Sequence, residues 1–315
     1  MKIVVTGGAG FIGANLCGEL SRRPEVSQVV VLDDLSSGRA ENLQGTGADI
    51  VKGSILDRPL LEDTLAGAAA VVHLAARPSV AMSVADPEGC HEVNATGTLR
   101  VLEACRLAGA YAVVASSCAV YGDRPDNPKH EDLPALPLSP YGAGKLATEA
   151  YAQAYAASFG MRTLALRFFN VYGPFQAADH VYAAVIPAFA DRALRGEPLL
   201  IHGDGLQTRD FTYVGTVVRV LADAVLRQVV SDAPVNVAQG SRTSLLELAA
   251  EFGRILDRPL PVEHLPAREG DIRDSRASCE RLHRLFPDLE RVPLETGLRR
   301  TLSWFRRSAA EEARA

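Results

Sequence analysis

The sequence predicts an α/β protein in which a doubly wound parallel sheet carries a smaller, mixed α/β lobe. Short apolar runs rich in β-branched residues alternate with longer helix-like segments through the first half of the chain, which is the pattern of repeated βαβ units. A glycine-rich loop follows the first apolar run, and the regular alternation ends near residue 170. The 315 residues are enough for a large core with an added lobe.

The expected strands are continuous apolar runs, as in strands that are buried on both faces of a sheet. They lie at residues 3–6, 29–32, 71–74, 111–115 and 162–168. Helices are expected at 11–22, 87–108 and 140–159 in the first half, and at 183–195, 214–226 and 245–256 in the second. Prolines recur through the second half of the chain and interrupt regular helices and strands, so its helices are expected to alternate with short extended pieces.

The charge balance gives nucleic acids and anionic membranes no general reason to bind. The chain has 33 Lys and Arg against 38 Asp and Glu, a net charge of −5, so an anionic ligand needs a local basic site. The longest uncharged stretch, 107–121, is shorter than the roughly 20 residues of a spanning helix. The apolar N-terminal stretch is broken by glycines and is not expected to be a signal sequence.

The cysteines and histidines do not form a pattern that would bind a metal. The five cysteines are odd in number, widely spaced and without a C-x-x-C pair, so neither a disulfide framework nor a zinc site is expected. Cys279 and His283 lie one helical turn apart, which is more simply incidental than half of a metal site. We predict no metal, and a cytoplasmic location, where thiols stay reduced.

The glycine-rich loop predicts a phosphate-binding turn of the Rossmann type. Gly8, Gly10 and Gly13 form a G-x-G-x-x-G pattern between the first strand and the first helix, the context in which this pattern binds a dinucleotide pyrophosphate. Bare backbone N–H groups and the positive end of the helix stabilise the phosphates. The alternative is a tight strand-to-helix turn without a ligand. The residues expected to contact the cofactor are Gly7, Gly10, Phe11, Ile12 and Gly13.

An acidic residue at the end of the second strand indicates which dinucleotide binds. Asp33 lies 20 residues after Gly13, where a carboxylate accepts hydrogen bonds from the adenosine ribose hydroxyls. Together with Asp34 it would repel a 2′-phosphate, and the one nearby cation, Arg39, follows a turn. The sequence therefore predicts NAD as the cofactor. The alternative is that both aspartates are only turn residues.

Three side chains with acid–base chemistry are expected at the edge of the sheet. Tyr141 and Lys145 are four residues apart near the start of a predicted helix, so they share one face. An ammonium and a positive nicotinamide ring nearby would lower the pKa of the phenol and make it a base. Ser117 follows the strand that ends at Ala115, at the edge where ligands of open α/β sheets bind.

With these motifs together, nearly the whole chain resembles the extended short-chain dehydrogenase/reductase family, specifically its nucleotide-sugar epimerases and dehydratases. The resemblance implies that Ser117, Tyr141 and Lys145 are the catalytic residues. It also implies further cofactor contacts from Leu74, Ala75, Ala76 and Asn94, and from Ser54 and Ile55. Ser54 departs from the family, which commonly has an aspartate at this position to contact adenine.

The residues next to Ser117 indicate which reaction of the family to expect. Dehydratases and decarboxylases of the family carry an acidic residue here, whereas this chain has Cys118 and Ala119. The resemblance therefore implies C4 epimerisation, in which a 4-keto sugar is formed, turns about its diphosphate and is reduced on its other face. Cys118 is interpreted as a small buried hydrophobe, and a role as proton donor is the alternative.

The resemblance also implies residues that bind the nucleotide sugar. Asn170, in Arg167–Pro174, and Arg209 and Arg268 would bind the diphosphate, and Asp271 would accept from the ribose. The alternative is that Arg268 and Asp271 pair with each other. Ser275 resembles the position beside the sugar C2 group, where a small residue admits N-acetylated sugars, and the segment Tyr182–Pro187 resembles that of N-acetylhexosamine epimerases.

The predicted function is reversible NAD-dependent C4 epimerisation of a UDP-hexose. The favoured substrates are UDP-N-acetylglucosamine/UDP-N-acetylgalactosamine and UDP-glucose/UDP-galactose. The alternatives are a UDP-glucuronate 4-epimerase, a nucleotide-4-keto-sugar reductase and a non-catalytic NAD-binding protein. Residues 1–170 are expected to form the NAD-binding domain, with part of 209–240 returning to it, and 171–315 mainly the nucleotide-sugar-binding lobe. The family also implies a homodimer.

Overall fold

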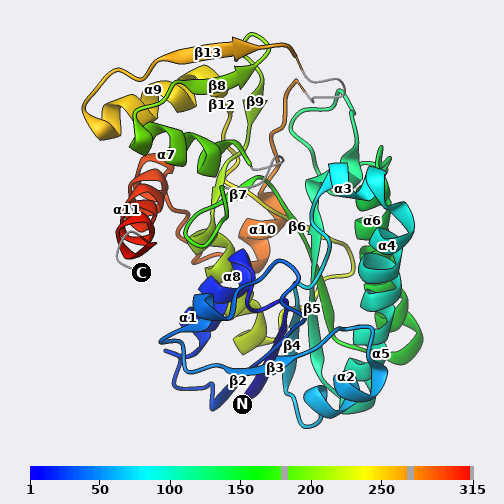
Figure 1. Ribbon diagram of the computed structural model, residues 1–315. Helices are drawn as coiled ribbons and strands as arrows, with labels where there is room; N and C mark the ends of the chain where they lie inside the picture. Colours follow the sequence, from blue (N-terminus) through cyan, green and yellow to red (C-terminus); the bar gives the residue numbers. More distant parts are fainter. Residues whose placement is uncertain (179–183, 268–272, 313–315) are drawn as a thin grey trace.

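In the computed structural model, which describes residues 1–178, 184–267 and 273–312, seven parallel strands form one central sheet (Figure 1). In spatial order they are β11 (Val235–Val237), β6 (Thr163–Phe168), β5 (Tyr111–Ser117), β4 (Ala70–His73), β1 (Lys2–Thr6), β2 (Gln28–Asp33) and β3 (Asp49–Lys52). The strand order reverses between β1 and β4, and open α/β sheets bind ligands at the carboxyl ends of the strands at such a point. The predicted fold class is confirmed.

Alternate residues of the strands enter two separate apolar cores, one on each face of the sheet. On β1, Ile3 and Val5 pack with the helices α1 (Phe11–Leu20) and α8 (Val214–Arg227). Val4 packs on the other face with α2 (Arg58–Leu65) and α5 (Gly97–Ala108). Figure 1 shows these two sets of helices on opposite sides of the sheet, which explains why the strands are apolar throughout.

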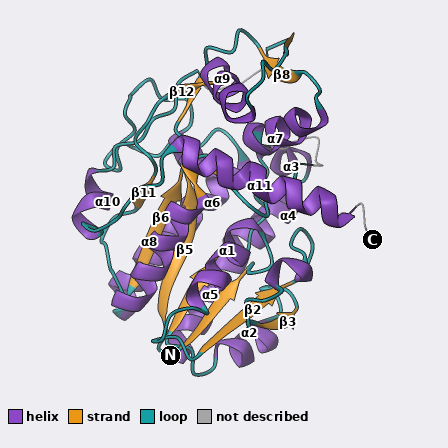
Figure 2. Cartoon of the chain, turned by 90° about the vertical axis from the view of Figure 1, so that its left-hand side faces the viewer, coloured by secondary structure: helices purple, strands orange, loops and turns teal. Residues whose placement is uncertain are grey.

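The remaining elements lie around the carboxyl ends of the strands or form the smaller lobe. On the same side as α2 and α5 lie α3 (Val80–Ala85), α4 (Pro87–His91), a π-helical turn (Glu92–Thr96) and the long α6 (Pro140–Phe159), while 3₁₀ turns follow β5 (Cys118–Tyr121) and β2 (Ala40–Leu43). The rest comprises β7 (Val171–Tyr172), α7 (Val185–Arg195), β8 (Leu199–His202), β9 (Thr208–Arg209), β10 (Thr212–Tyr213), β12 (Thr243–Ser244), α9 (Leu245–Leu256), β13 (Val262–Leu265), α10 (Glu280–Leu285) and α11 (Leu294–Glu312). β8 pairs with β13, β9 with β12 and β7 with β10, and α11 lies against α7 and α9 (Figure 2).

The structure differs from the expected elements at several places. The single helix predicted at 87–108 is interrupted by the π-helical turn, where the Asn94 side chain bonds the backbone of Arg77 through two hydrogen bonds of 2.8 and 3.1 Å. The strand β3 and the helix α2 were not expected. The residues of β3 are exposed or half-buried, so this edge strand lacks the apolar run that marks the other strands.

Candidate active site

The backbone of the glycine loop is tightly packed at Gly7 and Gly13 but open at Gly10. Gly7 has a left-handed φ of +71°, and a Cβ on this residue would meet the backbone N of Ala75 at 2.6 Å. A Cβ on Gly13 would collide with the carbonyl oxygen of Gly7. At Gly10, however, the same oxygen, at 3.3 Å, is the only described neighbour within 4 Å of an added Cβ. The space over Gly10, directly before α1 begins at Phe11, fits a pyrophosphate that approaches the backbone.

Asp33 lies at the end of β2 and is hydrogen-bonded to the glycine loop. One carboxylate oxygen accepts a hydrogen bond of 2.9 Å from the N–H of Ala9, and the other accepts one of 2.9 Å from Leu35. Burial raises the pKa of this carboxyl, while these two N–H groups lower it. Since a carboxylate has about four acceptor positions, two remain for ribose hydroxyls. The loop and Asp33 together fit an NAD molecule.

The other residues predicted to contact the cofactor surround the same edge. Leu74 and Ala75 directly follow β4, and Ala75 packs under Gly7. The Ser54 hydroxyl accepts a hydrogen bond of 3.1 Å from Leu56, whereas Ile55 is buried in the core beside Gly97. A contact between Ile55 and a cofactor would therefore use its backbone. Asn94 is buried in the π-helical turn, and its side chain is hydrogen-bonded to the backbone of Arg77.

The three residues predicted to be catalytic meet at the carboxyl end of β5. Ser117 ends this strand and caps the following 3₁₀ turn by accepting a hydrogen bond of 3.2 Å from Ala119. Tyr141 lies in the first turn of α6, and Lys145 lies one turn later. The ammonium of Lys145 donates a 2.8 Å hydrogen bond to the carbonyl of Ala115 and lies 6.0 Å from the centre of the Tyr141 ring.

The expected lowering of the pKa of Tyr141 is not a property of the polypeptide alone. Burial raises the pKa of Tyr141 to about 12, against a smaller opposing effect of the hydrogen-bonding Ser117. Burial also lowers the pKa of Lys145 to about 8. Because both groups are removed from water, desolvation is the largest effect on each pKa. Charges near the phenol would lower its pKa, but in the chain alone the burial of the phenol is the larger effect.

A buried ion pair that the sequence analysis did not identify lies beneath these residues. Glu149, one turn after Lys145 on α6, accepts hydrogen bonds of 2.8 Å from both Nε and Nη2 of Arg167 on β6. It also accepts one of 2.5 Å from Ser116, the neighbour of Ser117. Both charged side chains are 4% exposed. The spacing of four residues from Lys145 was the only signal in the sequence.

His73 is a second buried polar residue near the site. Its Nδ1 lies 2.7 Å from the Thr6 hydroxyl, and its Nε2 lies 3.0 Å from the Thr98 hydroxyl. Burial, reinforced by the charge of Lys145, lowers the pKa of this imidazole to about 3. His73 is therefore neutral and connects β1, β4 and α5 through hydrogen bonds.

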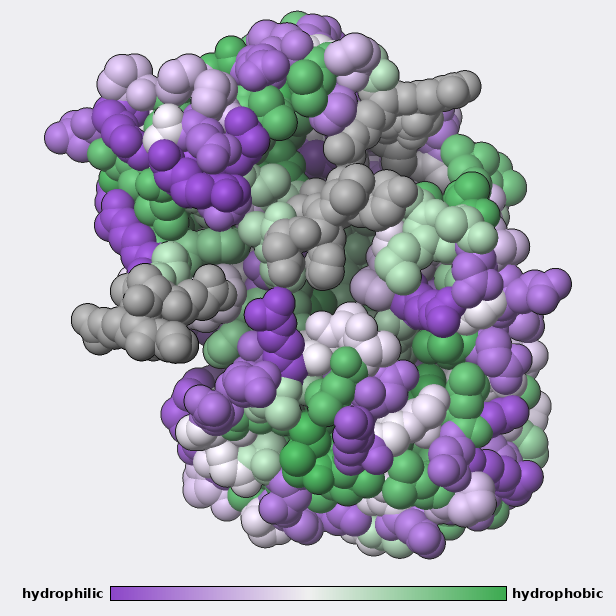
Figure 3. All heavy atoms as spheres, viewed as in Figure 1, coloured by the Kyte–Doolittle hydropathy of each residue, from purple (hydrophilic) through white to green (hydrophobic). Residues whose placement is uncertain are grey.

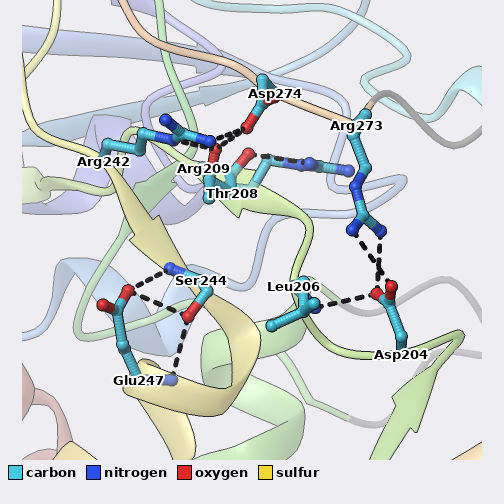
Figure 4. A network of polar contacts seen from close by, with 9 residues as sticks. All are labelled: Asp204, Leu206, Thr208, Arg209, Arg242, Ser244, Glu247, Arg273 and Asp274. Carbon is cyan, nitrogen blue, oxygen red and sulfur yellow. Dashed lines mark hydrogen bonds and ion pairs between the residues drawn. The ribbon is translucent and has the colours of Figure 1, made fainter.

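The predicted substrate-binding residues that the structure describes lie where the lobe meets the sheet. Asn170 has a left-handed φ of 33°, and its amide donates a 3.2 Å hydrogen bond to the carbonyl of Asp210. Arg209 donates a 2.8 Å hydrogen bond to the carbonyl of Thr208 (Figure 4). Ser275 is buried, and its N–H donates a 3.2 Å hydrogen bond to that same carbonyl. Figure 3 shows a hollow between the lobe and the sheet domain.

Several predicted positions have no described structure or a different environment from the one expected. Arg268, Asp271, Tyr182 and Ala183 lie outside the described residues. Cys118 is half-buried beside Ser117, and burial raises the pKa of its thiol. Within 1–178, 184–267 and 273–312, no group of three or more His, Cys, Asp or Glu side chains could hold a metal ion. Over the same residues, no helix is long and apolar enough to span a bilayer.

Comparison with known proteins gives matches along the whole chain. A model of a family described as NAD dependent epimerase/dehydratase matches residues 3–238. The curated UDP-glucose 4-epimerase of Mycolicibacterium smegmatis is 39% identical over 97% of this chain and 99% of its own. The structure of UDP-N-acetylglucosamine 4-epimerase from Methanobrevibacter ruminantium M1, in complex with UDP-N-acetylmuramic acid, is 35% identical, with a TM-score of 0.92 over 98% of both chains. The structure of MoeE5 with UDP-glucuronic acid and NAD is 38% identical, with a TM-score of 0.84 over 98% of this chain and 100% of its own.

Proposed function

The chain belongs to the NAD dependent epimerase/dehydratase family, and we propose that it interconverts UDP-N-acetylglucosamine and UDP-N-acetylgalactosamine, and also UDP-glucose and UDP-galactose. The predictions of family, of NAD as cofactor and of an NAD-dependent UDP-sugar 4-epimerase are confirmed. The choice of sugar and the roles of individual residues are proposals.

The observation that carries the proposed mechanism is the convergence of Ser117, Tyr141 and Lys145 beside the glycine loop. No carboxylate follows Ser117 directly, since the next two residues are Cys118 and Ala119. The site therefore offers one hydroxyl pair and one ammonium, which suits proton transfer at a single sugar carbon. Elimination of water or loss of a carboxylate would call for a further acid.

The residues of the chain act on the sugar 4-hydroxyl group. When bound, NAD supplies a hydride acceptor for C4 and a positive charge beside the site. Tyr141, as phenolate, accepts the proton of the 4-hydroxyl, and the hydroxyl of Ser117 hydrogen-bonds the same oxygen. Because burial raises the pKa of Tyr141 to about 12 in the chain alone, where Lys145 is already close, formation of the phenolate would require the further positive charge that bound NAD supplies. Tyr141 returns the proton after the 4-keto sugar has turned.

Two residues are proposed to hold the diphosphate while the sugar turns. Arg209 provides a planar cation suited to phosphate. Asn170 lies two residues after the end of β6, where its amide is hydrogen-bonded to the carbonyl of Asp210. The main support for N-acetylated sugars is the buried position of Ser275, where a small side chain leaves room for an acetamido group. UDP-glucuronate is the second candidate, because the structure of MoeE5 was determined with that nucleotide sugar.

The test follows the C4 proton by NMR while the purified protein acts on each UDP-sugar without added cofactor. The expected result is the C4 epimer of UDP-N-acetylglucosamine, formed fastest of the three and without net NADH. Faster turnover of UDP-glucuronate would replace the proposed substrate. No turnover of any of the three, even after NAD is added, would refute the proposed reaction.

A homodimer in the cytoplasm is also proposed. Leu107 on α5, and Tyr151 and Phe159 on α6, are 54%, 37% and 56% exposed. Apolar side chains on two adjacent helices fit a helix-to-helix interface. Sedimentation equilibrium at micromolar concentration is expected to give twice the mass of the chain, and Leu107→Glu with Phe159→Glu is expected to give the monomer.

A further inference from the structure

Asp210, which lies between β9 and β10, is a fully buried carboxylate that bonds backbone rather than a side-chain partner. Its two oxygens accept hydrogen bonds of 3.1, 3.0, 3.4 and 3.1 Å from the N–H groups of Gln239, Gly240, Ser241 and Ala277. The exposed fraction of the residue is 0%. Burial is the largest effect on the pKa of this carboxyl and raises it to about 6 against these four hydrogen bonds. Keeping the charge buried therefore costs free energy.

The four N–H groups come from two separate segments of the chain. Gln239–Ser241 form the turn after β11. Ala277 belongs to residues 273–278, here called the strap. The strap is also bonded to β9, because Thr208 donates a 2.9 Å hydrogen bond to the carbonyl of Arg273 and its hydroxyl donates one of 2.6 Å to Asp274. Asp210 thus ties the turn and the strap to the strand that carries Arg209.

Both residues proposed to bind the diphosphate are joined to Asp210, one by the chain and the other by a hydrogen bond. Arg209 directly precedes Asp210 in the chain. Asn170 donates its amide hydrogen bond to the backbone carbonyl of Asp210, at 3.2 Å. The strap also contains Ser275, whose N–H is bonded to the carbonyl of Thr208. Figure 4 shows Thr208, Arg209, Arg242 and Asp274 joined by hydrogen bonds, with the Arg273 side chain paired to Asp204.

We propose that Asp210 is a positioning residue for substrate binding: its carboxylate fixes the turn and the strap so that Arg209, Asn170 and Ser275 surround the nucleotide sugar. The inference rests on the proposed function, since it concerns the same nucleotide-sugar site. It predicts an effect on binding of the UDP group and not on the chemistry at C4, because Tyr141 and Lys145 lie on α6 and share no hydrogen bond with the turn or the strap among those the structure describes.

The variant that tests this is Asp210→Asn, which keeps the shape of the side chain. Its Nδ2 group cannot accept the N–H groups that bond to one carboxylate oxygen, so the turn and the strap lose half of their anchor. We expect the Kd for UDP, measured by calorimetry, and the KM for the UDP-sugar to rise about 10-fold, with kcat and bound NAD unchanged within about twofold.

Thr216→Val is the matched control. The Thr216 hydroxyl, on α8, accepts a 3.1 Å hydrogen bond from the N–H of Val292, so this variant also removes one buried acceptor of a backbone N–H. We expect it to lower the thermal midpoint and to leave the Kd for UDP unchanged. If Asp210→Asn also changes only the midpoint, or lowers kcat and NAD content together with affinity, Asp210 is merely structural and the proposal is overturned.

Hydrogen exchange on the unaltered protein gives a test that does not depend on the variant folding. Saturating UDP is expected to slow exchange at Gln239, Gly240, Ser241 and Ala277, and not at Val292. No change at the first four N–H groups would overturn the proposal. If the unaltered protein does not bind UDP at all, the proposed function fails and this inference fails with it, whereas UDP binding that ignores Asp210→Asn refutes the inference alone.

Discussion

Replacing Glu149 by Gln should destabilise the protein strongly, because it leaves the guanidinium of Arg167 buried without a counter-charge. Both side chains are 4% exposed, and two hydrogen bonds of 2.8 Å join them. Nη1 of Arg167 has no hydrogen-bond partner even in the intact pair. Removing one partner of a buried pair costs about 3–5 kcal/mol, which lowers the thermal midpoint of a chain of this size by roughly 5–8 °C.

A double-mutant cycle separates the ion pair from the loss of packing. Arg167→Met removes the charge that Glu149 neutralises, and it also removes the contact of the guanidinium with the Tyr121 ring, 4.6 Å from its centre. With Glu149→Gln and Arg167→Met combined, the loss of unfolding free energy in urea should be smaller than the sum of the two single losses by at least about 1.5 kcal/mol. Ser116 can still donate its hydrogen bond to the side-chain carbonyl of the new glutamine. The contribution of this bond should therefore be the same whether residue 167 is Arg or Met.

Two results would refute this reasoning. One is a Glu149→Gln protein within about 1 kcal/mol of the unaltered protein, since a surface pair would give that value. The other is strict additivity in the cycle, which would mean that the two residues contribute independently to the free energy of unfolding.

Three further variants or titrations test the site. Tyr141→Phe should retain bound NAD, seen by absorbance of the released cofactor, and lose C4 exchange by at least about 100-fold; undiminished turnover would disprove the assignment of the base. His73 should show no imidazole titration by NMR between pH 5 and 8; since its pKa is lowered to about 3 while the unfolded value is near 6.5, its contribution to stability is complete above about pH 6.5 and is lost as the pH falls toward 3, and His73→Asn should flatten that slope. Ser275→Tyr should abolish turnover of UDP-N-acetylglucosamine and spare UDP-glucose; equal loss of both would show that Ser275 does not set the choice of sugar.

The parts of the site that the sequence predicts are those built from neighbouring residues. The glycine loop and the Tyr141–Lys145 pair each lie within one turn of chain, so their spacing already fixes which atoms can meet. Asp33 is identifiable because a single βαβ unit sets its distance from the loop. The strands on both sides of β1 are predictable for a similar reason, since burial on two faces requires an unbroken apolar run.

The parts that the sequence does not predict depend on contacts between distant segments or on burial. Glu149 meets Arg167 across a sequence separation of 18 residues, and Asp210 meets Ala277 across 67. No local pattern distinguishes these residues from surface charges. The same limit applies to the pKa of Tyr141 in the chain alone, because the desolvation that raises it comes from the packing of the whole site.

Glu149 and Asp210, two buried carboxylates of the site, therefore have different partners, and the difference fits the proposed reaction. Glu149 is neutralised by a cation and bonded to Ser116, which holds the chemical groups of β5 and α6 rigidly against each other. Among the residues that the structure describes, the Asp210 carboxylate is bonded only by neutral N–H groups of the turn and the strap. A catalyst that lets a sugar turn between two hydride transfers needs a fixed base and a firmly held diphosphate, with room between them. The diphosphate-binding residues and the catalytic residues thus have separate anchors. Asp210→Asn should therefore weaken UDP binding while kcat is preserved, whereas Glu149→Gln should disturb the catalytic residues while UDP still binds. The opposite assignment of effects would show that the two sets of residues do not act separately.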